Sequence, residues 1–353
     1  MTQSQLPETD VTPDTVPYTA LAAYLREIFG AQLLAGAVTG SRACGWATTH
    51  SDYDLIAIIS PDSDVETPLR RYQAGVFQGV PTETLVVTID EARRICDLRA
   101  APRFWFTKGD DILRMEKFTS AKVLIGAPLW STLLAACSPA DYAAKRADRH
   151  WRIAAKFFDD LCGALDKGDA DLAVDACRAM LREEVEALLC RTGDTNGRRK
   201  WMARRIARAT GISTEIKTDF RRFHYLFDLS GETDLLPWVQ SAIGFHHALQ
   251  SAVLSSSKND VNRTGHGGTV SVPTDLHLAG PLFLWQIDRR WLVKSDNGEL
   301  ALPEPHVTLL LSVMGGQGRI QSSSATLAQD LIEARLLRTT QSAARSIVEP
   351  MTS

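Results

Sequence analysis

The sequence of 353 residues lacks long apolar runs and lacks an excess of charge of one sign. No segment approaches the roughly 18–20 uncharged apolar residues that a membrane-spanning helix needs, so we expect no membrane association. The 39 basic and 42 acidic residues leave a net charge of −3, so there is no strong signal for a nucleic-acid partner. Hydrophobic residues make up 44% and charged residues 23%, which excludes a disordered or fibrous chain.

Paired cysteines are absent as well. The six cysteines form no Cys-x-x-Cys motif, and several lie inside apolar helical patterns, so we expect free, mostly buried thiols. The first 18 residues are polar and acidic and lack the basic-then-apolar order of a signal peptide. Together these features predict a cytoplasmic protein.

The N-terminal part of the chain has the pattern of an α/β domain. A polar segment, residues 1–17, is expected to be flexible, and a domain is expected over 18–135. Within it, helical spacing of apolar residues is followed by apolar, strand-like runs; the helix covers 19–29 and the strands cover 33–38, 54–59 and 84–89. Strands this apolar, alternating with helix, predict a mixed sheet covered by helices on at least one face.

Beyond residue 135 the periodicity becomes helical, which predicts an all-α middle domain over 136–255. A segment with almost no large apolar residue, 256–268, is expected to be a linker. Residues 269–340 combine short strand patterns with helices, which predicts a small α+β domain that looks like a winged-helix or PqqD-like peptide-binding domain. Residues 341–353 form the tail.

One constellation in the first domain is typical of chemistry on phosphates. Gly40 and Ser41 follow a predicted strand, where free backbone N–H groups and a hydroxyl can hold phosphate oxygens. Asp52 and Asp54 stand one residue apart at a strand start, so both carboxylates project from one face, about 6–7 Å apart at Cα. Two negative charges at that distance repel by about 2–3 kcal/mol at an effective dielectric of ~20. A divalent cation such as Mg²⁺ would reverse that sign, and Glu83, at the entrance to the third strand, would add another carboxylate.

The run Gly-Ser-Arg-Ala-x-Gly followed by Ser-Asp-x-Asp-Leu, with an acidic residue on a later strand, resembles the nucleotidyltransferase superfamily that includes DNA polymerase beta. It looks closest to the bacterial branch that contains the aminoglycoside nucleotidyltransferases. The resemblance covers residues 20–125 well and the helical region more loosely. Cys44 departs from it, since many relatives carry a basic or polar residue there, and Glu83 replaces the commoner Asp.

The resemblance implies a role for each matching residue. Gly40 and Ser41 would hold the nucleoside triphosphate, with ATP favoured, and Arg42 is a candidate phosphate contact. The three carboxylates would be catalytic and would bind two Mg²⁺ ions, one on the triphosphate and one on the attacking hydroxyl. In the helical domain, Lys200 would reach the β- and γ-phosphates. The same domain offers candidate general bases; these are Glu183 and Glu184.

Each of these interpretations has a structural alternative. Gly40-Ser41 can be a plain strand-to-helix turn with a Ser cap, and Asp52 and Asp54 can be a solvated edge. Glu83 can be an ordinary residue at a strand start. A solvated helix face is the favoured interpretation of the Arg182-Glu183-Glu184 run, and a basic helix start is as good an interpretation of Lys200 as a phosphate contact.

Three functions therefore stay open at this point. The leading hypothesis is an Mg²⁺-dependent enzyme that moves a nucleoside monophosphate from an NTP to a hydroxyl of a small molecule, in antibiotic modification or specialised metabolism, and releases pyrophosphate. The second keeps the reaction but makes the acceptor a protein side chain, as in toxin–antitoxin nucleotidyltransferases. The third is a nucleotide-binding regulatory module whose C-terminal domain captures a peptide or protein.

Overall fold

The computed structural model describes residues 17–61, 72–101, 104–225, 235–257, 276–278, 281–287, 290–295, 298–314, 325–334 and 336–339. Three predicted segments lie almost entirely outside these residues. They are the flexible segment 1–17, of which only Pro17 is described, the linker 256–268, of which only two residues are described, and the tail 341–353. The contacts divide the chain into two compact units. Unit 1 comprises residues up to Tyr142 together with Asn196–Trp201, and unit 2 comprises Ala143–Thr195 and Met202–Ser353.

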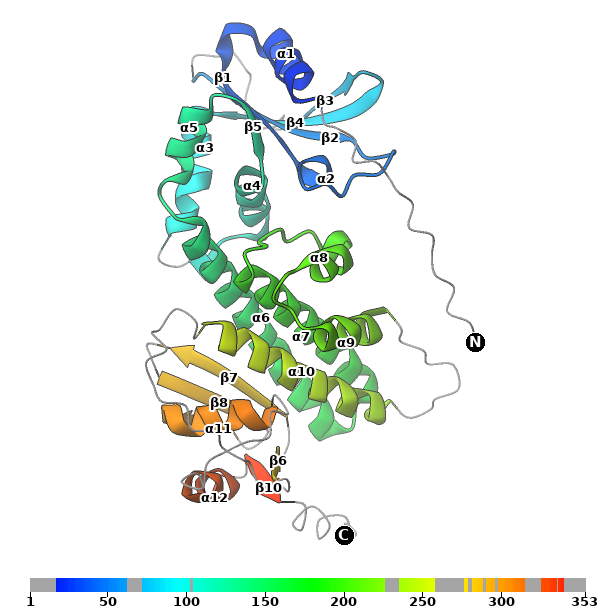
Figure 1. The fold of residues 1–353 in the computed structure, drawn as a ribbon, viewed down its shortest axis with the longest axis vertical. Helices are drawn as coiled ribbons and strands as arrows, with labels where there is room; N and C mark the ends of the chain where they lie inside the picture. The colour runs from blue at the N-terminus through cyan, green and yellow to red at the C-terminus, as the bar shows by residue number, and fades with distance from the viewer. Residues whose placement is uncertain are drawn as a thin grey trace, which may run out of the picture. The chain divides into compact units, whose positions relative to one another are not determined.

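Unit 1 is built on a five-stranded mixed sheet with the order β3-β4-β2-β1-β5 (Figure 1). The strands are β1 (Leu33–Thr39), β2 (Tyr53–Ile59), β3 (Tyr72–Phe77), β4 (Val80–Thr88) and β5 (Lys122–Ile125). β2 and β4 run parallel, and the other neighbouring strands run antiparallel. The mixed sheet agrees with the expectation from the sequence, which had marked neither β3 nor β5 as a strand.

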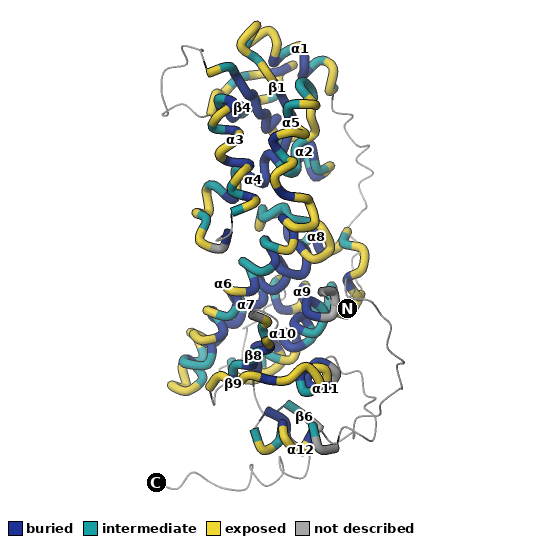
Figure 2. Tube along the Cα trace, turned by 90° about the vertical axis from the view of Figure 1, so that its left-hand side faces the viewer, coloured by how far each residue is buried: buried dark blue, intermediate teal, exposed yellow. Residues whose placement is uncertain are grey.

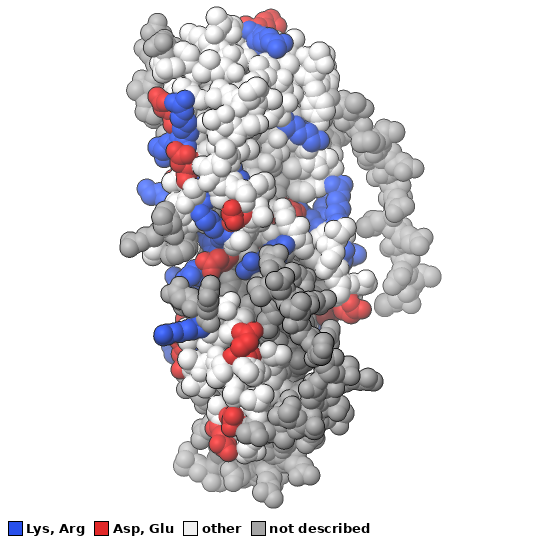
Figure 3. Space-filling view, turned by 60° about the vertical axis from the view of Figure 1, so that its left-hand side comes forward, with Lys and Arg blue, Asp and Glu red and all other residues white. Residues whose placement is uncertain are grey.

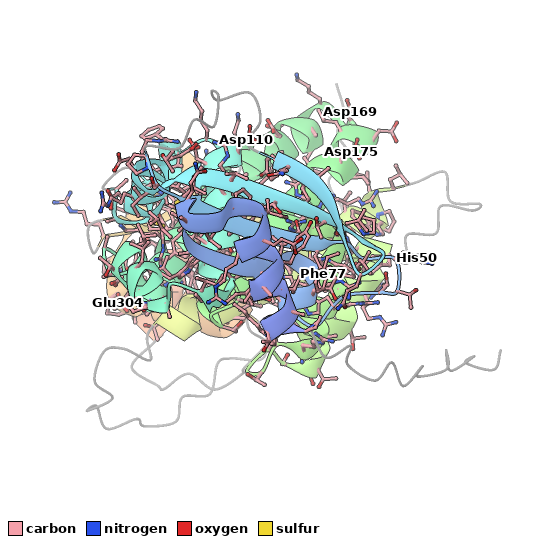
Figure 4. The ribbon with its side chains drawn as sticks, turned by 90° about the horizontal axis from the view of Figure 1, so that it is seen from above. His50, Phe77, Asp110, Asp169, Asp175 and Glu304 are labelled. Carbon is pink, nitrogen blue, oxygen red and sulfur yellow. The ribbon has the colours of Figure 1, made fainter. Side chains whose placement is uncertain are left out.

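Successive side chains along these strands point to opposite faces of the sheet, and each face carries its own hydrophobic core. On one face, Leu21 and Leu25 of helix α1 (Tyr18–Phe29) pack on Val38 and Leu55, and α1 lies across the strands (Figures 1 and 4). The opposite face, which carries Ile56, is covered by three helices, α3 (Ile89–Asp97), α4 (Gly109–Thr119) and α5 (Ala127–Leu134). The short elements of this unit are α2 (Gly40–Ala43), η1 (Gly30–Gln32), η2 (Leu98–Ala100), η3 (Phe104–Phe106) and η4 (Arg199–Trp201).

Unit 2 is mostly helical in its first half. Its helices are α6 (Pro139–Lys167, whose first turn belongs to unit 1), α7 (Ala170–Arg191), α8 (Met202–Arg208), α9 (Thr214–Tyr225) and α10 (Leu236–Ser257). The break between the first two of these helices has a clear local cause. Gly168 adopts a positive φ of 67°, which glycine tolerates, and the Asp169 carboxylate then caps α7 by accepting from the backbone N–H of Leu172 at 3.0 Å.

The C-terminal part of unit 2 adds a small antiparallel sheet, β7 (Leu282–Ile287), β8 (Arg290–Ser295) and β9 (Gly298–Leu302). It is followed by α11 (Glu304–Met314) and α12 (Ala325–Glu333), and the short strands β6 (Leu276–Leu278) and β10 (Leu337–Thr339) pair with each other. The helices and this sheet share one hydrophobic core, since Trp151 and Phe158 of α6 contact Phe283 of β7. The ranges predicted as a helical domain and a separate C-terminal domain are therefore packed together.

Burial follows this architecture. Strand β1 of unit 1 and helix α7 of unit 2 are drawn largely as buried in Figure 2. Strand β2 is buried throughout, whereas the edge strands β3 and β5 are mostly exposed or half-buried. All six cysteines are free thiols, and four of them, Cys96, Cys137, Cys177 and Cys190, are buried. Among the residues that the structure describes, no helix is long and apolar enough to span a membrane. On the face shown in Figure 3, the described basic and acidic side chains are interspersed.

Candidate functional site

The candidate site lies in unit 1, where β1 ends and α2 begins. Gly40 opens α2 with a positive φ of 71°, and a Cβ at this position would collide with the Oδ2 atom of Asp54. Only glycine allows the backbone to approach that carboxylate so closely. Ser41 follows it and is buried at 7% exposure.

The strand register brings the acidic residues predicted from the sequence to one place. Because β2 and β4 are parallel neighbours, Asp54 stands directly opposite Glu83. Both share the strand face of Ile56, so they point to the side of the sheet that α4 covers. Asp52 precedes the first residue of β2 and is exposed. The carboxylate of Asp54 is almost buried at 7% exposure, whereas that of Glu83 is 47% exposed.

A lysine lies between two of these carboxylates. The Nζ atom of Lys117, on α4, is 3.1 Å from Oδ1 of Asp54 and 3.8 Å from Oε2 of Glu83. It also lies over the ring of Tyr72, 4.9 Å from the centroid. The helix holds it there because Met115 and Phe118 on either side of it are fully buried in the core below the sheet. Lys117 is therefore held in the site by the fold.

More cations come from the segment Asn196–Trp201, which belongs to unit 1 although it lies between α7 and α8 in the chain. The guanidinium of Arg198 is 3.6 Å from Oδ1 of Asp54, the same oxygen that Lys117 contacts. The segment is anchored on unit 1 by Asn196, which donates to the Sγ atom of Cys44 at 3.5 Å, and by the contact between the rings of Trp201 and Trp46. Lys200, predicted from the sequence as a phosphate contact, lies in this segment.

Two cavities meet at this cluster. The first, about 320 Å³, contains the three predicted carboxylates; it is lined by Ser41, Thr48, His50, Ser51, Asp52, Asp54, Glu83, Arg198, Lys200 and Trp201. The second, about 500 Å³, is lined by Thr39, Gly40, Tyr72, Leu113, Glu116, Lys117, Ser120, Asn196, Gly197, Arg198, Arg199 and Lys200. Arg198 and Lys200 line both, so a cationic wall is common to the carboxylate cavity and the larger cavity. The loop that bears His50 lies at the periphery of the molecule in Figure 4.

Arg42 takes a different position from the one expected. It is 6% exposed, and its guanidinium donates to the backbone carbonyls of Ser51, at 2.6 Å, and Asp52, at 3.2 Å. It also lies over the ring of Tyr53 at 4.2 Å. Arg42 therefore fixes the loop that presents Asp52 and does not line either cavity.

The two candidate general bases lie in unit 2 and are buried there. Glu183 is 4% exposed and its Oε2 atom is 2.7 Å from Nδ1 of His150. Glu184 is fully buried, 2.7 Å from Nδ1 of His246. Burial raises the pKa of Glu184 well above its ordinary value and lowers the pKa of His246 to about 4. A fully buried carboxyl that is bonded inside a core cannot reach an acceptor hydroxyl in solution, so Glu184 is a core residue.

The predicted pair of Mg²⁺ ions can be tested against this arrangement. Carboxylates are the hard oxygen ligands that Mg²⁺ prefers, and Asp52, Asp54 and Glu83 line one cavity. The ammonium of Lys117, however, stands between Asp54 and Glu83. Within the part of the chain that the structure describes, no group of three or more His, Cys, Asp or Glu side chains is arranged to hold a metal ion. The side chains as they stand therefore do not fit two ions shared by three carboxylates.

Comparisons with known proteins add little to this geometry. No protein-family model matches the chain, and no curated protein is similar to it. Among solved structures, a nucleotidyltransferase-like protein from Exiguobacterium sibiricum 255-15 is similar over 90% of this chain and 89% of its own, with a TM-score of 0.37 and 14% identity. A likeness this distant supports no conclusion about the activity of this chain.

Sequence reasoning missed Lys117, Arg198 and Glu116. Glu116 is 6% exposed, accepts a hydrogen bond from the hydroxyl of Tyr142 at 2.6 Å and lines the larger cavity. A usable signal existed for the α4 pair, because Glu116 and Lys117 stand between apolar residues that keep helical spacing, where charges are costly unless paired. Residues 198–200 are a basic run in the sequence, but the pairing of Arg198 with Asp54 depends on tertiary placement.

Proposed function

We propose that this chain is an enzyme that transfers a nucleoside monophosphate from an NTP to a hydroxyl group of a small molecule. One observation carries the proposal: three carboxylates and a cationic wall line adjoining cavities beside a glycine-serine junction at the end of a strand. An ordinary solvated edge does not require Gly40 to lie against a buried Asp54, or a basic segment distant in the chain to cover it.

The cations fit the triphosphate. Arg198 and Lys200 line both cavities, so a triphosphate lying along their common wall would meet both, with the Ser41 hydroxyl on the carboxylate side. Guanidinium and ammonium groups are the strong partners of phosphate oxygens, arginine as a bidentate donor and lysine as a point charge. Arg198 is only 32% exposed, which strengthens such contacts because the site excludes part of the solvent.

The reaction balances without any further reactant. The acceptor oxygen attacks the α-phosphorus, a new P–O bond forms, and the bond from the α-phosphorus to the bridging oxygen breaks, so pyrophosphate leaves with that electron pair. The hydroxyl proton passes to Asp52 or Glu83, the two carboxylates of the cavity that are open to solvent. The cationic wall stabilises the charge on the leaving pyrophosphate. Dependence on Mg²⁺ stays a prediction of the sequence.

The charges also bear on the acceptor. The larger cavity carries four cationic side chains, Lys117, Arg198, Arg199 and Lys200, against the single carboxylate of Glu116. An acceptor that enters it meets positive potential, which disfavours a polycation such as an aminoglycoside and favours a neutral or anionic hydroxyl compound.

The test is a transfer assay with each of the four NTPs labelled at the α-phosphate. The full chain is incubated with Mg²⁺ or with EDTA, and with either a set of small hydroxyl compounds or protein alone. We expect label on a small molecule and release of pyrophosphate, lost in Asp52→Asn and at least tenfold weaker in Lys200→Met, because that variant removes a phosphate contact. Lys108→Met, at an exposed position before α4, is the control and should keep full activity.

Three results would contradict this proposal. Unchanged transfer in Asp52→Asn would show that the Asp52 carboxylate takes no part in the reaction. Label found on protein alone would support a protein side chain as acceptor. Binding of NTP with no transfer to any acceptor would favour the regulatory module.

A further inference from the structure

We propose that Lys117 serves as a permanent cation between Asp54 and Glu83, so that the site takes one divalent ion and not two. The inference rests on the proposed nucleotidyl transfer and concerns the same site. Its starting point is the disagreement between the predicted pair of ions and the arrangement of the side chains.

The position of Lys117 is built into the fold. Its side chain is 10% exposed, and its ammonium lies near Asp54, Glu83 and the Tyr72 ring. A surface lysine is a flexible chain with a hydrated head, whereas a buried ammonium persists only where partners offset its lost hydration. Here two carboxylates and an aromatic ring supply those partners.

The helix that bears Lys117 leaves it little freedom. Phe118, the next residue, is fully buried and stacks on Trp130 at 5.2 Å between ring centroids. Glu116, the preceding residue, is held by the hydroxyl of Tyr142. To vacate the gap, the lysine side chain would have to leave both carboxylates while its backbone stays fixed on both sides.

The charges in the carboxylate cavity explain why we expect it to bind one divalent ion. Three carboxylates line this cavity, and the cations Lys117 and Arg198 both contact the same Oδ1 atom of Asp54. The Oδ2 atom of Asp54 lies against Gly40, so the exposed carboxylate of Asp52, together with the phosphate oxygens of the nucleotide, is left for one ion from solution. An ion placed between Asp54 and Glu83 would stand at contact distance from the ammonium, and like charges at that distance repel strongly in a partly buried site.

The experiment counts bound Mn²⁺ per chain by electron paramagnetic resonance, with the full-length protein saturated by α,β-methylene-ATP, which cannot be transferred. We expect one Mn²⁺ in the wild type and two in Lys117→Met, which keeps the apolar stem and removes the charge. Lys108→Met is the matched control and should bind one ion. Two ions in the wild type would overturn the inference, and so would an unchanged count in a folded Lys117→Met.

A second pair of variants keeps the test decisive if Lys117→Met does not fold. Glu83→Gln should leave the count at one, because Glu83 faces the lysine and not the ion, and Asp52→Asn should weaken Mn²⁺ binding at least tenfold. If Glu83→Gln lowers the count from two to one, a metal occupies the gap. Binding of the analogue is measured separately by calorimetry, so a chain that binds no nucleotide contradicts the proposed function, whereas two ions beside a bound nucleotide contradict the role of Lys117 alone.

Discussion

Asp52 and Asp54 are separated by a single residue, yet their surroundings in the fold differ. Asp54 is nearly buried and its Oδ1 atom contacts two cations, while Asp52 is exposed before the strand begins. The repulsion expected from the sequence is therefore offset at Asp54 by Lys117 and Arg198. Both aspartates line the carboxylate cavity, but we expect only Asp54 to contribute to the stability of the fold as well.

Neutralising each aspartate should separate these two roles. Asp52→Asn is expected to abolish transfer while changing the free energy of unfolding by less than about 0.5 kcal/mol, as is usual for an exposed position. Asp54→Asn should also abolish transfer and should lower the free energy of unfolding by about 1–3 kcal/mol, because Lys117 loses its charged partner. Urea unfolding followed by circular dichroism measures the difference, and equal stabilities would show that the Lys117–Asp54 pair contributes nothing.

Glycine at position 40 gives a second prediction at the scale of single residues. Gly40 and Gly45 both adopt a positive φ, 71° and 69°, so alanine at either position costs about 1–2 kcal/mol of backbone strain. At Gly40 the new Cβ also meets the carboxylate of Asp54, whereas at Gly45 nothing lies within 4 Å of it. Gly40→Ala should therefore lower both the unfolding free energy and NTP binding, and Gly45→Ala only the former. Equal NTP affinity in the two variants would show that the close approach of Gly40 to Asp54 does not affect NTP binding.

At the scale of elements, a buried polar network joins α7, α10 and β7 in unit 2. His246 on α10 lies 2.7 Å from Glu184 on α7 and 2.9 Å from the carbonyl oxygen of Leu282 on β7. Gln250 adds two bonds to β7, one to the carbonyl of Leu282 and one from the N–H of Leu284. Since burial raises the pKa of Glu184 and lowers that of His246, we expect both groups to be uncharged in the folded protein, with the carboxyl donating its proton to Nδ1.

This assignment predicts how stability depends on pH. Glu184 has a pKa above its unfolded value, so its contribution to stability is fully present below the unfolded pKa of about 4.5 and is lost as pH rises toward the folded pKa, by about 1.4 kcal/mol per pH unit. Burial lowers the pKa of His246, so that residue has the opposite effect, costing stability as pH falls from about 6.5 toward 4.

A glutamine at position 184 can donate to His246 and cannot ionise. Glu184→Gln is therefore expected to gain stability over the wild type at pH 8, by roughly 1 kcal/mol or more, and to match it near pH 5. Glu299→Gln, which removes the same charge at an exposed position of β9, is the control. Urea unfolding at the two pH values measures the difference; an identical effect of Glu184→Gln at both would mean that Glu184 is ionised in the core.

The elements also show what the sequence could and could not predict. Long helices are predictable nearly to their ends, because packing of one apolar face sets their pattern. Helical periodicity covers 139–166 and 169–192, and the structure has α6 and α7 there. β3 was missed because it is an edge strand, mostly exposed and interrupted by Gly75, and β5 because it has only four residues. The Gly40–Asp54–Glu83 part of the site depends on local motifs and two strand pairings, β1 with β2 and β2 with β4. Lys117 reaches Asp54 across 63 positions of the chain, and no local pattern encodes that contact.

At the scale of the whole molecule, the packing of the C-terminal sheet decides whether the part of the chain before residue 257 can fold without the part after it. The sequence predicts a linker there and hence a separable C-terminal domain. In the structure, the indole N–H of Trp151 donates to the carbonyl of Leu284 at 2.9 Å, and Phe283 lies against Trp151, Phe158 and His246. Removing β7 would expose these aromatic rings to water and leave His246 and Gln250 without their bonds to Leu282.

A chain that ends at Ser257 is therefore expected to lose the cooperative unfolding of unit 2. Each fully buried aromatic or aliphatic side chain that becomes exposed forfeits about 1.5–3 kcal/mol, and several such losses exceed the 5–15 kcal/mol that stabilises a typical domain. A chain that ends at residue 340 removes only the tail and serves as the control, with an expected melting temperature within about 2 °C of the full chain. Circular dichroism, calorimetry and limited proteolysis of the three chains provide the comparison. If the chain that ends at Ser257 stays soluble with a sharp thermal transition and protease-resistant helices, the common core does not hold the helices together, and the predicted linker marks a true domain boundary.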